Sequence, residues 1–214
     1  MKKEEIKSRE LKRILEAKFD VFDFKDIKDE ELDSVNKLFV RKRKLNGEET
    51  DIDLSEISNF KGLNELRLLG FRLTKDDMKI ITNMKLESLV LSNCEFENIE
   101  SLNMPKLKDL VIFGGENVEN VFIKSPEMLI IEGTDLDFSK IDILDTKQIN
   151  MFNCNIKNMD SLKKYDKLEF INFDGSIITD TNGKELKSTN DINVGENVVL
   201  SFEEEYRKTG LNNY

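Results

Sequence analysis

The stretch LESLVLSNCEF, residues 86–96, decides the fold because its apolar pattern returns along the chain. It has apolar residues at positions one, four, six and eleven, and Cys94 at position nine. The template starts again at residues 63, 107, 126, 146, 168 and 189, in steps of 19 to 23 residues. Positions four and six are apolar in all seven copies. This repetition predicts one buried strand in each copy.

Position eight carries glycine or asparagine in the first six copies, although this position was not used to align them. The residues are Gly70, Asn93, Gly114, Gly133, Asn153 and Gly175. Glycine and asparagine tolerate a positive φ better than other residues. Each strand is therefore expected to end in the same kind of turn.

The segments between the copies show a second rhythm. Apolar residues stand three apart after Phe96 and again after Ile156, which is typical of short 3₁₀ or irregular helical turns. Residues 74–84 instead predict a fuller helix, with Thr74 as its N-cap and with Met78 and Ile81 facing inward.

The copies resemble leucine-rich repeats, whose motif L-x-x-L-x-L-x-x-(N/C)-x-L they follow over about residues 54–200. The three-residue rhythm is similar to the bacterial internalin type, and residues 73–84 are closer to longer, helix-bearing repeats. The resemblance implies an α/β fold: a curved solenoid with parallel strands on its concave face and short 3₁₀ or α turns on its convex face. Position nine departs from the family pattern, since it holds Phe71, Cys94, Gly115, Thr134, Cys154, Ser176 and Asn197.

A solenoid needs caps at its ends, because each repeat buries its apolar face only against its neighbours. We expect an N-terminal cap over residues 1–53, in which Leu11, Ile14, Leu15 and Phe19 share one helical stripe. The segment VNKLFVRKRKL, residues 35–45, fits either a degenerate first strand or one arm of a capping hairpin. Residues 201–214 are expected to form a C-terminal capping helix that starts at Ser201.

Composition excludes several classes of function. A net charge of −10 argues against general nucleic-acid binding, and we interpret Arg41–Lys44 as the solvated face of an edge strand. Without histidine the chain lacks the usual acid–base and nucleophilic arrangements. We therefore expect no enzymatic activity, no cofactor and no metal.

Location and redox state follow from two further features. No apolar run is long enough to span a bilayer, and the first ten residues do not look like a signal peptide, so we expect a cytoplasmic protein unless an export signal has been trimmed. Cys94 and Cys154 occupy the same position three repeats apart, about 14 Å in stacked strands, which is too far for a disulfide. Both are predicted to be reduced and buried.

Alternation along each strand sends positions three, five and seven to the concave face. There the middle repeats are expected to expose a connected apolar band, a common mark of an interface. The predicted partner-binding residues are Arg67, Leu69, Val90, Val111, Phe113, Met128, Ile130, Glu132, Phe152 and Phe170. The predicted acidic rim consists of Glu65, Asp109, Glu132, Asp174 and Asp191. This rim favours a protein partner with basic residues.

Three functions are compatible with this surface. The first is a non-enzymatic module that binds a protein partner on the concave strands. The second is a homodimer or a structural module of a larger or surface assembly, in which the band meets a second copy or is covered within the chain. The third is an enzyme subunit with a carboxylate site at the rim, which would require close, buried acids with raised pKa values.

Overall fold

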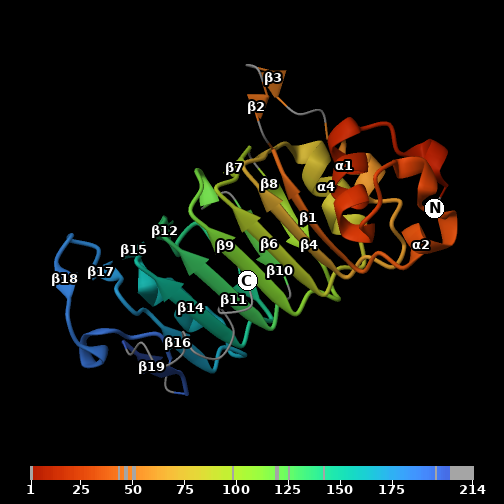
Figure 1. Cartoon of the computed structure of the whole chain (residues 1–214). Helices are drawn as coiled ribbons and strands as arrows, with labels where there is room; N and C mark the ends of the chain where they lie inside the picture. The colour runs from red at the N-terminus through yellow and green to blue at the C-terminus, as the bar shows by residue number, and fades with distance from the viewer. Residues whose placement is uncertain are drawn as a thin grey trace.

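A large parallel sheet forms the centre of the chain in a computed structural model (Figure 1). The structure describes residues 2–42, 44–45, 48–49, 52–97, 99–118, 121–124, 126–141, 143–195 and 197–202. Within them the sheet has eight strands in the order β1-β4-β6-β9-β11-β14-β16-β19, which follows the chain. The strands are β1 (Lys37–Arg41), β4 (Glu65–Leu69), β6 (Ser88–Ser92), β9 (Asp109–Phe113), β11 (Met128–Glu132), β14 (Gln148–Phe152), β16 (Phe170–Asn172) and β19 (Val199–Ser201).

These strands pair in parallel and in register, so equivalent positions of the repeats stack in rows. Leu66, Leu89 and Leu110 are Cα partners in one row, and Leu68, Leu91 and Ile112 follow two residues later. All six are buried in the main core. Positions four and six therefore supply the core, as the sequence predicted.

The expected turn at position eight is confirmed. Gly70, Asn93, Gly114, Gly133, Asn153 and Gly175 all have φ between 47° and 75°. In this region a glycine has no Cβ to clash, and an asparagine is better tolerated than most residues. The backbone N–H of Asn93 donates to the carbonyl of Phe113 in the next repeat, so the turn also links neighbouring copies.

The α-helices lie at the N-terminal end of the sheet and behind its first strands (Figure 1). Ser8 caps α1, whose Leu11 and Leu15 are buried in the core, as predicted. Thr74 caps α4 through a capping box with Asp77, and Met78 and Ile81 are buried, again as predicted. The helical segments are η1 (Lys3–Glu5), α1 (Arg9–Phe19), η2 (Phe24–Asp26), α2 (Asp29–Asp33), α3 (Leu54–Ile57), α4 (Lys75–Asn83), η4 (Met159–Lys164) and η5 (Thr189–Asp191).

Smaller sheets lie after the ends of the large-sheet strands and on the far side of the core. They contain β2 (Lys44–Leu45), β3 (Glu48–Glu49), β5 (Arg72–Leu73), β7 (Glu95–Phe96), β8 (Ile99–Asn103), β10 (Val121–Lys124), β12 (Asp135–Asp137), β13 (Ile143–Leu144), β15 (Asn155–Lys157), β17 (Ile177–Thr179) and β18 (Glu185–Leu186). The three-residue rhythm after Ile156 is the 3₁₀ helix η4, as expected. The same rhythm after Phe96 is strand β8, not a helical turn, because β8 pairs in parallel with β10 of the next repeat.

The strand predicted in the seventh copy was misplaced. Residues 189–191 form the 3₁₀ turn η5, and the eighth strand comes later, with Val199 opposite Phe170. The Ser188 hydroxyl accepts from the backbone N–H of Asn190, a local bond that competes with strand pairing. Asp191, Asn193 and Gly195 therefore do not lie on the sheet face assigned to them.

Residues 35–45 were expected to form either a first strand of the sheet or one arm of a hairpin, and this region contains both, one after the other. Residues 37–41 are strand β1, which pairs with β4 in the large sheet, and β2 and β3 form an antiparallel hairpin directly after it. The C-terminal helix was expected over residues 201–214. Ser201 is the last residue of β19, and residues 203–214 lie outside the described residues, so the helix remains a prediction. Among the described residues, no helix has the length and apolar character needed to cross a membrane.

Two glycines at strand exits provide a test of the turn geometry. A Cβ on Gly115, whose φ is 108°, would lie 2.3 Å from the carbonyl oxygen of Cys94. A Cβ on Gly133, at φ 67°, would meet nothing within 4 Å. Gly115→Ala should therefore lower the free energy of unfolding by roughly 2–4 kcal/mol, and Gly133→Ala by only about 1 kcal/mol. Urea unfolding measures both, and equal losses would contradict the close approach at Cys94.

Candidate functional site: a groove between helix α1 and the first strands

The groove face is the name we give to the side of the large sheet opposite the main core. Positions three, five and seven of each strand point to it, and the register stacks them in three rows. The middle row runs Phe39, Arg67, Val90, Val111, Ile130, Asn150, Asn172 and Ser201. Residues from distant parts of the chain thus become neighbours on one surface.

The expectation of an exposed apolar band in the middle repeats is wrong for four of its members. Val90, Val111, Ile130 and Phe152 are buried and form an apolar cluster separate from the main core. Phe113 and Met128 pack against this cluster and are half-buried, as is Phe170. The band exists as a packed layer, and the exposed apolar side chain on this face at the β1 edge of the sheet is Phe39. That the predicted residues contact a partner remains a prediction.

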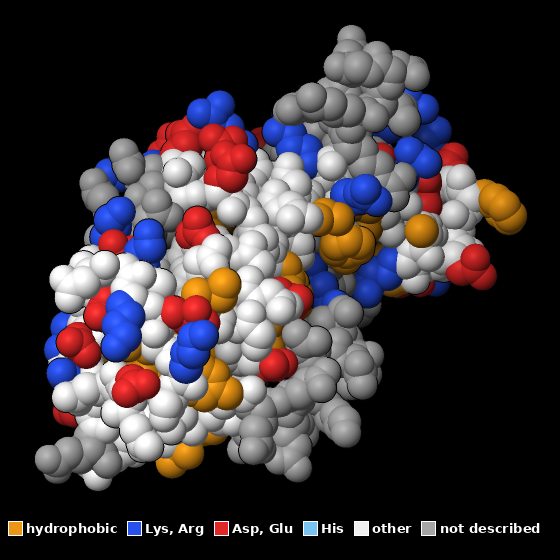
Figure 2. Space-filling model, turned by 90° about the vertical axis from the view of Figure 1, so that its left-hand side faces the viewer, with side chains coloured by type: hydrophobic (Ala, Val, Ile, Leu, Met, Phe, Trp, Pro, Cys, Tyr) orange, Lys and Arg blue, Asp and Glu red, His pale blue; other side chains and the backbone are white. Residues whose placement is uncertain are grey.

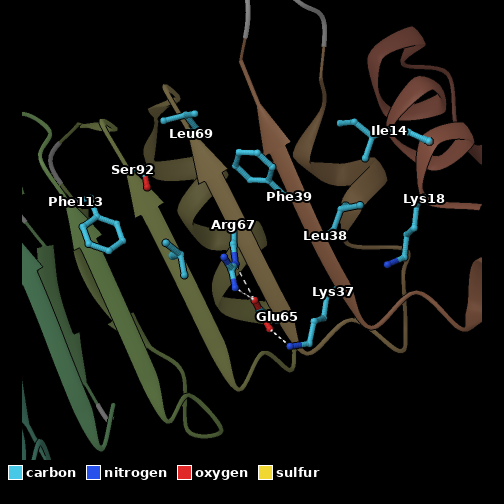
Figure 3. A pocket seen from close by; sticks show the side chains of 12 residues that line it. Ile14, Lys18, Lys37, Leu38, Phe39, Glu65, Arg67, Leu69, Ser92 and Phe113 are labelled. Carbon is cyan, nitrogen blue, oxygen red and sulfur yellow. Dashed lines mark hydrogen bonds and ion pairs between the residues drawn. The ribbon is translucent and has the colours of Figure 1, made fainter. Parts of the chain in front are cut away.

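A groove of about 850 Å³ opens between α1 and strands β1, β4, β6 and β9 (Figure 3). The residues that line it are Ile14, Ala17, Lys18, Lys37, Leu38, Phe39, Glu65, Arg67, Leu69, Val90, Ser92 and Phe113. The space-filling view shows hydrophobic side chains in a hollow bordered by Lys and Arg side chains (Figure 2). The volume is within the range of small-molecule and peptide pockets.

Phe39 is the most exposed large apolar side chain in this lining. It is 55% exposed, and Leu69 on the neighbouring strand β4 and Phe113 on the more distant β9 are half-buried. In Figure 3 these three side chains stand on the same side of the sheet, with Ile14 of α1 on the opposite wall. Exposed apolar groups concentrated in a hollow favour contact with another apolar surface.

A three-residue ion network stands at one end of the groove. The Glu65 carboxylate accepts from Arg67 Nε at 2.7 Å and Nη2 at 2.6 Å, and Lys37 Nζ lies 2.6 Å from its other oxygen. Burial alone would raise the pKa of Glu65, but the hydrogen bonds from Lys37 and Arg67 outweigh burial and hold that pKa below its ordinary value. Glu65 therefore stays ionised and holds both cations in place.

Asp109 stands in the same cross-strand row as Glu65, but its pKa is shifted in the opposite direction. Asp109 is half-buried two strands from Glu65, and burial raises the pKa of its carboxyl, opposed by Lys108 and assisted by Glu127. Two strand spacings are about 10 Å, too far for these acids to share a proton. The pair does not form the cluster of close acids with raised pKa values that an enzyme site would require.

The remaining predicted rim acids do not gather at the groove. Glu132 and Asp174 are half-buried on later repeats, and neither lines the groove. Asp191 lies in η5, away from the sheet face. Within the described part of the chain, no group of three or more Cys, Asp or Glu residues is arranged to hold a metal ion.

Sequence reasoning missed half of this groove. Lys37 and Phe39 belong to β1, whose alternating pattern KLFVR matches positions three to seven of the template and could have been aligned with it. Ile14 and Lys18 line the groove from α1, and no local signal in the sequence shows where this helix docks. Of the predicted partner-binding residues, the structure brings Arg67, Leu69, Val90 and Phe113 to the groove, and of the predicted rim it brings Glu65.

Both cysteines are free and buried, as expected. Cys94 Sγ contacts the carbonyl of Leu68 at 3.7 Å, and Cys154 Sγ contacts that of Ile131 at 3.6 Å. Burial raises the pKa of both thiols, which keeps them protonated and unreactive.

Comparison with known proteins gives little beyond this geometry. No family model matches the sequence, and no curated protein matches it either. The matching solved structures include the crystal structure of an internalin (inlF) from Listeria monocytogenes. It is 15% identical, with 91% of this chain and 76% of that chain covered and a TM-score of 0.31. A likeness of this size carries no argument, so the fold rests on the strand pairing and the site on the groove.

The raised pKa of Asp109 leads to a pH-dependent prediction. A carboxyl whose folded-state pKa is above its unfolded value, about 3.9, costs stability once the pH exceeds that value. Asp109→Asn should therefore unfold at higher urea than the native chain at pH 7, and this gain should vanish below about pH 3.5. The exposed Asp166→Asn serves as control and should change little. A gain for Asp109→Asn that persists at low pH would contradict the electrostatic cause.

A pair of asparagines in the middle row leads to a second prediction. Asn172 is 0% exposed, and among the described residues neither its Nδ2 nor its Oδ1 has a hydrogen-bond partner; the same holds for Asn150 Oδ1. A buried amide without a partner costs about 1–3 kcal/mol. Asn172→Leu, of similar shape, should therefore leave the free energy of unfolding unchanged or raise it. A loss of more than about 1 kcal/mol in urea unfolding would show that the amide is satisfied in solution.

Proposed function

We propose that this chain is a non-enzymatic protein-interaction module. It holds a segment of a partner protein in the groove between α1 and strands β1, β4, β6 and β9. The observation that carries the proposal is the groove itself, about 850 Å³ in volume, with the 55% exposed Phe39 at its centre. Such exposure costs free energy in water, and a partner that covers the ring recovers it.

The groove offers enough apolar surface for measurable binding. Covering one large apolar side chain contributes about 1.5–3 kcal/mol, and Phe39, Leu69 and Phe113 all line the same groove. Ordering a partner segment offsets part of this gain. The balance corresponds to a weak, reversible contact in the millimolar to micromolar range, unless charged groups add to it.

The chain is, on this proposal, a leucine-rich-repeat solenoid whose N-terminal helices act as its cap. The strand spacing of about 20 residues, the in-register parallel rows and the shared left-handed turn support this class. Leu11 and Leu15 of α1, buried against the core, support the role of this helix as a cap. Two buried free thiols are consistent with a reducing, cytoplasmic environment.

Self-association remains the alternative outcome for the same surface. A second copy that covers Phe39 would bury the same side chains, and light scattering at increasing concentration distinguishes this case from binding of a foreign segment. A native dimer that Phe39→Ser converts to a monomer would assign the groove to the chain's own interface.

The test of the proposal is selection from a random library of displayed 12-residue peptides on the immobilised chain. We expect Phe39→Ser to abolish the enrichment, because it removes the central apolar contact without disturbing the core. Phe22→Ser is the matched control, since Phe22 is fully exposed and does not line the groove, and it should select like the native chain. Equal enrichment on the native chain and Phe39→Ser would overturn the groove as the binding site.

A further inference from the structure

We infer that the segment held by the groove is acidic as well as apolar, with carboxylates close to an aromatic or leucine side chain. This inference rests on the proposed function and names the chemistry of its partner. The whole chain has a net charge of −10, whereas the lining of this groove carries more cations than acids.

The groove lining is positive. Among the residues that the structure describes, it contains Lys18, Lys37 and Arg67 but a single carboxylate, Glu65, which leaves a formal charge of +2. Attractive charges across an interface select partners and speed their association. A basic segment would meet this excess of cations unfavourably.

The one acid of the lining is already neutralised. Glu65 is only 11% exposed at its side chain and lies within 2.6 Å of both Lys37 and Arg67. Lys37 is 64% exposed and Lys18 is exposed, so both ammonium groups can reach a ligand in the groove. Figure 3 shows Lys18 and Lys37 on facing elements at the same end of the groove.

The apolar and cationic groups alternate closely enough for one short segment to meet both. On β1 the outward residues are Lys37, Phe39 and Arg41, so an aromatic ring stands between two cations. The width from β1 to β9 is three strand spacings, about 14 Å, which an extended segment of four or five residues crosses. Carboxylates one or two residues from an aromatic or leucine side chain fit this pattern.

This conclusion reverses the sequence prediction of a basic partner. Of the five acids in the predicted rim, Glu65 alone is in the groove lining, and the other four are Asp109, Glu132, Asp174 and Asp191. The cations of β1 were not counted, because that strand had not been assigned to the sheet. The local charge at the groove therefore has the opposite sign from the rim as a whole.

The experiment analyses the peptides that the same 12-residue library yields on the native chain and not on Phe39→Ser. We expect Asp and Glu to be enriched several-fold beside Phe, Tyr or Leu. A selected peptide should lose about tenfold in affinity when its acids become amides, and its binding should weaken as salt rises. Fluorescence anisotropy of the labelled peptide gives these values.

Substitutions of the groove lysines test whether cations of the chain bind the acids of the peptide. Lys18→Glu and Lys37→Gln should each weaken the selected peptide by about tenfold. Lys157→Glu is the matched control for Lys18→Glu, because it makes the same charge change on the exposed side of β15, outside the groove, and should bind like the native chain. Circular dichroism melting checks that each variant is folded.

The outcomes separate this inference from the proposed function. Peptides that depend on Phe39 but are neutral or basic would overturn the acidic partner and leave the binding groove in place. A library with no Phe39-dependent enrichment would overturn both. A single-stranded DNA oligonucleotide that binds with dependence on Lys18 and displaces the peptide would assign the cations to nucleic acid and overturn the inference.

Discussion

Parallel strands that pair residue for residue send every second side chain to the same face, and this alternation places both the core and the groove. Because the side-chain period of a strand is two, a slip of one residue would exchange the two faces completely. The left-handed turn at position eight ends each strand at the same point, so the register is kept from one repeat to the next. Leu68 in the core and Arg67 in the groove therefore depend on the same constraint.

Features that depend on local chemistry were predictable from the sequence. The buried leucines, the turns at Asn93 and Gly133, and the Thr74 capping box all follow from residue types at fixed spacing. The late position of β19 was not predictable from the template, because the Ser188 turn competes locally with a strand. The extended form of residues 99–103 depends on pairing with β10, a contact that three-residue spacing does not encode.

The binding surface was harder to predict than the fold because exposure depends on packing in three dimensions. The apolar residues of the groove face were placed on the correct side of the strands, and yet Val111 and Phe152 are buried. Charge shows the same limit. A chain with a net charge of −10 still carries a groove lined by three cations and one paired acid, since composition averages over the whole surface.

The edge of the sheet explains why the groove lies at the first strands and not in the middle. A side chain on a central strand, such as Val111 on β9, has strand neighbours on both sides, and these neighbours bury it. Among the described strands, Phe39 has a strand neighbour, Arg67, on one side only, and on the other side α1 turns its half-buried Ile14 toward the hollow. The helix that buries Leu11 and Leu15 in the core thus also forms one wall of the site. Stability at this end of the sheet and the binding surface therefore depend on the docking of one helix.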